Sequence, residues 1–201
     1  MTDLREQLVD EVLVMDCQRG HVKALETLIS RWQKRLWRYV YRLTGSSEAA
    51  WEVTQDSWLG IVQSIGRLHD PAKFKAWAYR ITTNKANDWK RNNLHRHTVP
   101  AAGSQEQTTD AAERSGHDAV QRLDASIDVH TILRRLPEPA RAVLTLYYLE
   151  EFGVADLATV LRIPIGTVKS RLHTARGEFR ALWRSMCQAG EPEEASQTKE
   201  H

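Results

Sequence analysis

The sequence predicts an all-α protein made of two small helical domains, and three observations support this fold class. The 201-residue chain has only 10 Gly and 6 Pro, so residues that form turns are too scarce for many short strands. Apolar residues recur at spacings of three and four over long stretches, which is the period of an amphipathic helix. A polar stretch separates two such helical blocks, and a hydrophobic content of 41% allows each block a core.

The first block opens with an amphipathic helix over residues 25–43. Its apolar side chains fall on one stripe, formed by Leu25, Leu28, Ile29, Trp32, Leu36, Tyr39, Val40 and Leu43. We expect this helix to stop near Gly45, because glycine adopts the left-handed conformation at a helix C′ position without steric cost. Ser46 or Ser47 can then cap a second helix, which should run to about Gly66.

A third long helix should begin at Asp70-Pro71 and end near Leu94. The Asp70 carboxylate can accept the free amide hydrogens of a helix start, and proline at the first helical position loses no intrahelical bond. Its apolar side contains Phe74, Trp77, Ala78, Ile81 and Trp89, and its cationic side contains Lys73, Lys75, Arg80, Lys85, Lys90 and Arg91. For Trp77 and Trp89, burial in the helical bundle is the alternative to a role at the surface.

The domain boundaries follow from the change in composition. Residues 1–94 form the first domain, and residues 95–124, rich in Ser, Thr, Gln, Gly and acids, read as an acidic flexible linker. The apolar helical pattern resumes in residues 125–187, with a break at Pro137-Glu138-Pro139, which indicates a second helical domain. Residues 188–201 have no apolar periodicity and are expected to be a disordered tail.

A helix-turn-helix is predicted within the second domain, in VADLATVLRIPIGTVKSRLHTARGEF from Val154 to Phe179. A short helix reaches a turn at residues 162–164, and a second helix follows at once. Such a pair suits binding in the major groove of DNA, although two helices in a packed bundle with a solvated basic face would show the same pattern. The polar candidates on the second helix are Thr167, Lys169, Ser170, Arg171, His173, Thr174 and Arg176.

The formal net charge of +2 hides a segregation of charge along the chain. Residues 73–97 carry seven Lys/Arg against the single acid Asp88, and residues 162–184 carry six against Glu178 alone. Residues 104–128, between them, carry six acids against Arg114 and Arg122. Clustered positive charge attracts a phosphate backbone, but it is also found on ordinary solvated helix faces.

Several classes of protein are disfavoured. Cys17 and Cys187 lie near opposite ends of the chain, so a disulfide framework is not expected, and together with His95 and His97 they lack the spacing of a metal site. The sequence contains no phosphate-binding glycine loop and no nucleophile motif. No apolar run approaches the roughly 20 residues that span a bilayer. We therefore expect a cytoplasmic protein without cofactor, metal or enzymatic activity.

Three ordered stretches of the chain resemble the sigma-70 family, in its extracytoplasmic-function (ECF) branch. They are RLWRYVYRLTGSSEAAWEVTQDSWLGIV, FKAWAYRITTNKANDWKR, and LPEPARAVLTLYYLEEFGVADLATVLRIPIGTVKSRLHTAR. The resemblance implies that the first domain is like sigma region 2 and the second like region 4. It further implies a bacterial sigma factor that binds core RNA polymerase and directs it to promoters.

The resemblance assigns roles to residues of the first domain. Four positions correspond to the surface that docks on core polymerase: Gln55, Asp56, Trp58 and Leu59. The segment that opens the minus-10 element and holds its single strand would use cationic, aromatic and amide groups, which suit unpaired bases. These candidates are Arg67, His69, Lys73, Trp77, Tyr79, Arg80, Asn84, Asn87, Lys90 and Arg91.

In the second domain, the resemblance implies that the recognition-helix candidates bind the duplex minus-35 element. Thr174 stands where the family commonly has Arg, while Asn87 and Lys90 stand where it usually has apolar residues, so the promoter sequence does not carry over. An anti-sigma factor is a possible further partner, and the two domains are expected to stay compact until polymerase spreads them. The alternative is a stand-alone helix-turn-helix regulator that binds duplex DNA without polymerase.

Overall fold

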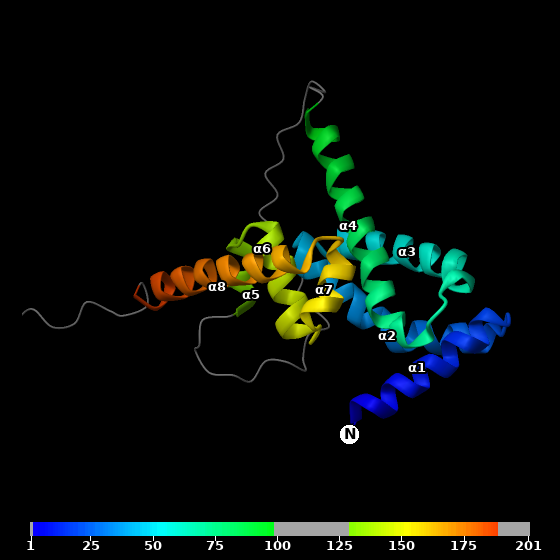
Figure 1. Ribbon diagram of the computed structural model, residues 1–201. Coiled ribbons are helices and arrows are strands. Elements are labelled where there is room, and N and C mark those ends of the chain that lie inside the picture. The colour runs from blue at the N-terminus through cyan, green and yellow to red at the C-terminus, as the bar shows by residue number, and fades with distance from the viewer. Residues whose placement is uncertain (1, 99–128, 189–201) are drawn as a thin grey trace, which may run out of the picture.

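The computed structural model describes residues 2–98 and 129–188, and it is helical throughout apart from turns and short connections. The first domain contains four helices, with two 3₁₀ turns before the last of them: α1 (Thr2–Gln18), α2 (Val22–Thr44), α3 (Ser47–Ser64), η1 (Ile65–Arg67), η2 (Pro71–Lys73) and α4 (Phe74–Thr98). Helix α4 extends beyond the body of the domain (Figure 1). The expected linker falls almost wholly outside the described residues, and so does the expected tail.

The helix ends of the first domain form where the sequence predicts them. Gly45 ends α2 with φ 76°, and its amide donates to the carbonyl of Tyr41 at 2.8 Å. The Ser46 side chain accepts from the amide of Ala49 at 3.2 Å and so caps α3. The Asp70 carboxylate accepts from the amide of Ala72 at 3.1 Å and caps the 3₁₀ turn η2, which leads directly into α4. Two features differ from the prediction: α1 was not expected, and α4 continues to Thr98.

Aromatic residues join α2 to α4 in the core of the first domain. Trp32 packs edge-on against Phe74, with 5.6 Å between ring centroids. Tyr39 lies 5.1 Å from Tyr79, and its hydroxyl shares a 2.8 Å hydrogen bond with Thr83. Burial of side chains of this size supplies most of the hydrophobic stabilisation of a small domain, and here it fixes α4 on α2.

The second domain contains α5 (Val129–Arg135), α6 (Glu138–Leu144), the π-helical turn η3 (Thr145–Leu149), α7 (Val154–Leu161) and α8 (Ile165–Gln188). Its core is built around the buried side chains of Ile132, Leu136, Leu146 and Leu157. The turn between α7 and α8 places Arg162 in the left-handed region with φ 54°, which redirects the chain into α8. This is the predicted helix-turn-helix.

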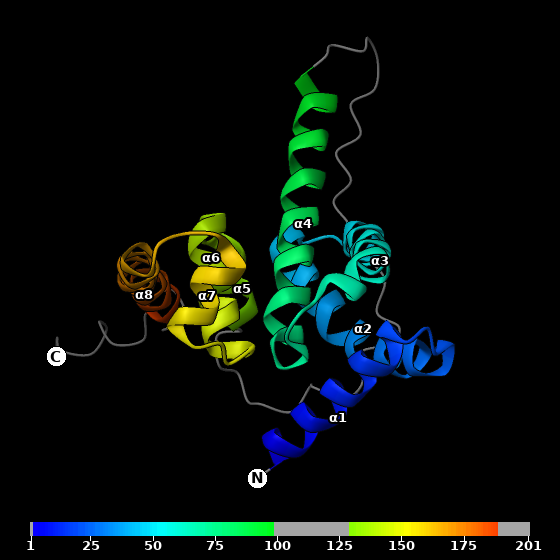
Figure 2. The same cartoon turned by 45° about the vertical axis from the view of Figure 1, so that its right-hand side comes forward.

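The two domains pack against each other. Helix α7 lies beside α4, and α5 and α6 lie beside α2. Figure 2 shows α5–α8 as one lobe next to the lobe of α1–α4. Among the described residues, no helix has the length and apolar character needed to cross a bilayer.

Candidate nucleic-acid interface

Six of the candidates for single-stranded DNA form one stripe along α4. Starting from the last residue of η2, they follow one another at alternating spacings of four and three, which keeps them on one face of a helix. Each side chain is exposed or half-buried. We call this set the open stripe: Lys73, Trp77, Arg80, Asn84, Asn87 and Arg91.

The two tryptophans of α4 are anchored rather than free. Trp77 is half-buried and packs against the core, 6.2 Å from Phe74 between ring centroids. Trp89 is also half-buried, and its indole nitrogen donates to the Glu52 carboxylate of α3 at 2.7 Å. From the sequence, Trp77 could be buried in the bundle or act at the surface. In the structure one side of its ring packs on the core, while the rest remains accessible on the open stripe.

The other four candidates of this group lie elsewhere. Arg67 and His69 are exposed in the segment between α3 and α4. Tyr79 has 0% of its surface exposed, so it is not available to DNA in this arrangement of the domains. Lys90 is half-buried and forms a 2.9 Å ion pair with Glu138 of α6. Tyr79 and Lys90 thus face the second domain, not the open stripe.

Glu150 of the second domain occupies a polar cluster at the domain contact. Its carboxylate accepts from the Tyr79 hydroxyl and lies 3.1 Å from the Arg42 guanidinium. Burial raises the pKa of Glu150, and the hydrogen bond from Tyr79 and the charge of Arg42 offset only part of this rise. Burial, then the adjacent Glu150 charge, raise the pKa of Tyr79 well above its ordinary value, so its hydroxyl stays a donor.

Helix α8 presents the duplex-binding candidates to solvent. Val168, Leu172 and Ala175 are buried on one side and hold the helix against the rest of the domain. Thr167 is half-buried, and the remaining six candidates are exposed: Lys169, Ser170, Arg171, His173, Thr174 and Arg176. A basic helix held by one apolar side, with its polar side open from the first turn onward, has the geometry of a major-groove reader.

Arg176 differs from the other α8 candidates because it is engaged within the domain. Its guanidinium donates to the Tyr148 hydroxyl at 2.8 Å and stacks over both Tyr147 and Tyr148, at 5.3 and 5.6 Å from the ring centroids. Tyr148 is itself exposed. The sequence prediction missed this aromatic pair, since it lies in η3 and outside the helix-turn-helix motif.

Of the four residues on α3 that were expected to dock on polymerase, three are exposed and one is buried. Gln55, Asp56 and Leu59 are exposed, Leu59 at 61% of its surface. Trp58 is only 8% exposed and packs in the core of the first domain, so its side chain is not on that surface. Two exposed apolar residues that were not among the candidates, Trp51 and Val62, share a helix face with Gln55 and Leu59. The spacing of these four positions by four, four and three residues was visible in the sequence and predicts that they share one helix face.

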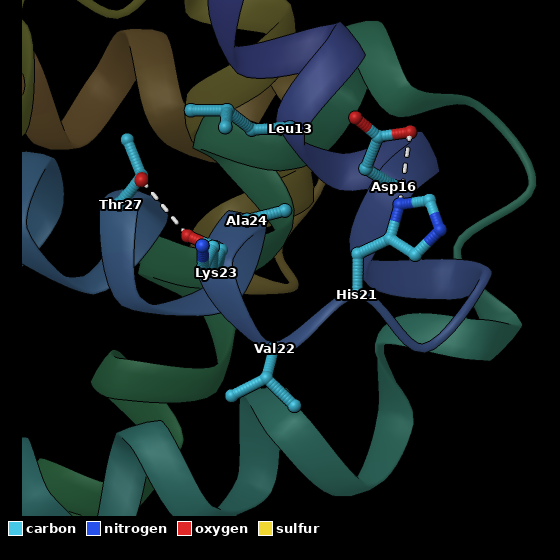
Figure 3. A pocket seen from close by; sticks show the side chains of 7 residues that line it. All are labelled: Leu13, Asp16, His21, Val22, Lys23, Ala24 and Thr27. Atoms are coloured by element: carbon cyan, nitrogen blue, oxygen red, sulfur yellow. Dashed lines mark hydrogen bonds and ion pairs between the residues drawn. The ribbon is translucent and has the colours of Figure 1, made fainter.

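A shallow hollow of about 550 Å³ lies where α1 turns into α2 (Figure 3). It is lined by Leu13, Asp16, His21, Val22, Lys23, Ala24 and Thr27. The Asp16 carboxylate and His21 approach to 3.6 Å at its edge. None of the lining residues belongs to α4 or α8, so the hollow is separate from the DNA-binding candidates on both helices.

Comparison with known families supports the resemblance seen in the sequence. A family model described as Sigma-70 region 2 matches residues 28–96, and one described as Sigma-70, region 4 matches residues 126–178. The chain belongs to the sigma-70 family. The region 2 match covers α3 and nearly all of α4, and the region 4 match covers α7 and the first half of α8. The presence of both regions favours a sigma factor over a stand-alone regulator.

Curated relatives of this sigma factor belong to the same family. The RNA polymerase sigma-H factor of Pseudomonas aeruginosa is 28% identical over 177 residues, which cover 83% of this chain and 90% of the relative. The ECF RNA polymerase sigma factor SigW of Bacillus subtilis is 26% identical over 179 residues, which cover 86% of this chain and 96% of the relative. The second of these relatives is named as an ECF factor, which agrees with the ECF branch inferred from the sequence.

Two solved structures share the fold. One is the sigma factor RpoE of Bartonella quintana in complex with the anti-sigma factor NepR, with a TM-score of 0.65, 20% identity, and coverage of 81% of this chain and 98% of that one. The other is CnrH in complex with the cytosolic domain of CnrY, with a TM-score of 0.61, 20% identity, and coverage of 91% and 99%. At this identity they support the two-domain all-α fold alone.

Proposed function

We propose that this sigma factor binds core RNA polymerase in the cytoplasm and directs it to promoters that carry a minus-35 and a minus-10 element. The observation that supports this most directly is the pairing of two different nucleic-acid surfaces in one chain. The open stripe of α4 combines cations with aromatic and amide groups, whereas α8 presents a basic polar face on a helix-turn-helix. Proteins that read only duplex DNA have no need for the first surface.

The open stripe suits an unpaired strand. Lys73, Arg80 and Arg91 supply cations along the helix, which can follow a phosphate backbone. Trp77 offers a ring face for stacking, and Asn84 and Asn87 offer amide donors and acceptors for the edge of an extruded base. The spacing along one face lets a strand contact them in succession.

Helix α8 suits the duplex minus-35 element. Lys169, Ser170 and Arg171 lie in its first two turns, which is the part of a recognition helix that reaches base edges. An arginine there can donate to both acceptors of a guanine, and His173 and Thr174 add contacts to bases or phosphates. Arg176, stacked on two tyrosines, is preorganised for a phosphate.

The exposed face of α3 is the proposed docking surface for core polymerase. Trp51, Leu59 and Val62 form an apolar patch, and Gln55 and Asp56 border it with polar groups. An apolar centre with a polar rim is the usual composition of a protein interface. An anti-sigma factor is a second proposed partner, supported by the solved structure of the same fold in which the sigma factor RpoE is bound to the anti-sigma factor NepR.

Run-off transcription tests the proposal. Purified core polymerase is supplied with genomic promoter fragments, including the region upstream of this gene, with and without the protein. We expect transcripts that depend on the protein, and their start sites define the two promoter elements. Absence of transcripts and of binding to core, together with specific duplex binding by the protein alone, would contradict it.

A further inference from the structure

Helix α1 was not expected from the sequence, and one of its faces is fixed to the rest of the first domain. Asp10, Val14 and Gln18 follow one another at spacings of four, which keeps them on one side of the helix. The Asp10 carboxylate accepts from Arg31 of α2 at 2.8 Å, and Val14 is fully buried in the core. The last turn of α1, which carries Gln18, is therefore held in a defined position.

The carboxamide of Gln18 binds the connection between α3 and α4. Its Nε2 donates to the main-chain carbonyl of Ile65 at 3.0 Å and to that of Leu68 at 2.7 Å. These residues lie 47 and 50 positions away in the chain, and α1 lies beside both η1 and η2 (Figure 1). A carboxamide has two N–H groups, so one side chain can hold the two sides of the η1 turn at once.

The same connection has two buried anchors and two exposed polar side chains. Ile65 is 6% exposed and Leu68 is 8% exposed, whereas Arg67 and His69 are open to solvent. The amide of Leu68 donates to the carbonyl of Ile65 at 3.1 Å and closes the η1 turn. Arg67 and His69 are the direct neighbours of Leu68, so both extend from the backbone that Gln18 holds.

Arg67 and His69 lie close to the start of the open stripe. His69 precedes Lys73, the first member of the stripe, by four residues, which span at most about 14 Å of chain. A strand that follows the stripe can therefore contact this pair at its end. The Arg67 guanidinium can donate to the edge of an unpaired base, and the His69 imidazole can both donate and accept. The pair can thus select a base as well as attract a phosphate.

We propose that Gln18 is a positioning residue for base selection in the minus-10 element. Its two hydrogen bonds hold the backbone on both sides of Arg67, and so keep Arg67 and His69 in one conformation that accepts one base and disfavours the others. This inference rests on the proposed function. Donors on a mobile segment adapt to several partners, whereas donors fixed by supporting hydrogen bonds discriminate between them. Gln18 acts through this connection and does not itself contact DNA.

Two variants remove the donor and keep the approximate size of the side chain. Gln18→Met is apolar and of similar length, and Gln18→Glu has the same shape but places an acceptor against two carbonyls. The matched controls are Gln7→Met and Gln7→Glu. Gln7 lies about three turns earlier on α1, where its carboxamide donates to Glu11 of the same helix at 3.0 Å. Circular dichroism and urea denaturation check that all four variants fold.

Hydrogen–deuterium exchange of the full chain tests the structural step. Peptides that cover residues 65–73 should exchange about fivefold faster in both Gln18 variants than in the wild type, and at the wild-type rate in both Gln7 variants. Peptides of α2 should be unchanged in all four. Equal exchange of residues 65–73 in the Gln18 variants and the wild type would overturn the proposal, because the connection would then be held without this side chain.

Transcription from a randomised promoter measures base selection. Each position of the minus-10 element of a promoter found by run-off transcription is randomised, and sequencing of the transcripts made with core polymerase gives the base preference. We expect the preference at one or two adjacent positions to fall about fivefold in both Gln18 variants, while the minus-35 preference and the affinity for core stay at the wild-type level. A wild-type minus-10 profile in either Gln18 variant would overturn the proposal.

A combined variant separates positioning from direct contact. In a background with Arg67→Ala and His69→Ala, Gln18→Met should cause no further loss of preference, since neither side chain remains to be positioned. A further loss of the same size would show that Gln18 acts elsewhere, and would overturn the proposal. Absence of transcripts that depend on the wild type contradicts the proposed function and this inference with it. Wild-type transcripts with an unchanged profile in the Gln18 variants contradict this inference only.

Discussion

Helices α4 and α8 both present basic surfaces, but they are held in opposite ways. Helix α8 is anchored by three buried residues on one side, and its polar side is open along the whole recognition segment. Helix α4 is packed on α2 and α3 within its own domain and is partly covered by α7 of the other domain. The candidate residues on α8 are therefore open to solvent in the free chain, whereas two of the candidates on α4, Tyr79 and Lys90, contact acidic residues of the second domain.

The largest effect is expected from a substitution on α8, the proposed duplex-binding helix. Arg171→Ala removes a guanidinium from the exposed first turns of α8, and loss of a bidentate base contact costs about 1–3 kcal/mol, or roughly 5- to 150-fold. We expect run-off transcription from promoters with a minus-35 element to fall by about this factor. Arg180→Ala is the matched control, because nine residues along a helix place Arg180 on the opposite face of α8.

A smaller effect is expected from the open stripe. Arg80→Ala removes one cation from the middle of α4, and we expect single-strand binding and opening of the minus-10 element to fall about fivefold. Permanganate reactivity of unpaired thymines in the complex with polymerase measures the opening. Lys85→Ala, which removes the same charge from another face of α4, should have little effect. Equal losses in both variants would show that overall charge, and not the stripe, holds the strand.

Most helix boundaries and the turn between α7 and α8 were predictable from local sequence. Gly45, Ser46 and Asp70 end and begin helices through the chemistry expected of them, and the turn at residues 162–164 is where the apolar pattern breaks. Such features depend on residues within a few positions of each other. Helix α1 was missed because the N-terminal segment was considered only as a signal or membrane sequence and not as a helix of the domain.

The contact of the second domain with one face of α4 was not predictable. It depends on Glu150 reaching Lys75, Tyr79 and Arg42, which lie 75, 71 and 108 residues away in the chain. Sequence patterns show that Tyr79 and Lys90 are polar residues on a helix but not that another domain covers them. In the same way, the pattern on α3 cannot separate the buried Trp58 from the exposed Leu59 without knowledge of which neighbours pack there.

A pH titration sharpens the comparison at Glu150. Since burial raises its pKa, the closed arrangement binds a proton more tightly than the open one, so closure should strengthen as the pH falls through this raised pKa and weaken as it rises. The charges of Arg42, Lys75 and Arg35 act on this carboxyl, and the Tyr79 hydroxyl donates to it. A pair of labels, on Cys187 of α8 and on an introduced Ser30→Cys of α2 in a Cys17→Ser background, reports the distance between the domains. Glu150→Gln should remain closed and lose the pH dependence; an unchanged pH response in this variant would exclude Glu150 as its source.

The smallest effects concern two residues that end α-helices in the left-handed backbone conformation, Gly45 in the first domain and Arg162 in the second. Gly45→Ala places a Cβ at φ 76° and should lower the free energy of unfolding by about 1 kcal/mol. Arg162→Gly relieves the same strain at φ 54° and should raise it by up to about 1 kcal/mol. Urea denaturation measures both, with Gly66→Ala as a control at a glycine with open space and no positive φ. Opposite signs at positions 45 and 162 are the expected result.

Footprinting of the complex with core polymerase tests the central claim that one chain uses α8 on duplex and α4 on single-stranded DNA. At a promoter found by run-off transcription, we expect protection of the duplex minus-35 element together with permanganate-reactive thymines in the minus-10 element, both dependent on the protein. Protection of a symmetric duplex site by the protein alone, with no reactive thymines when polymerase is added, would contradict the account.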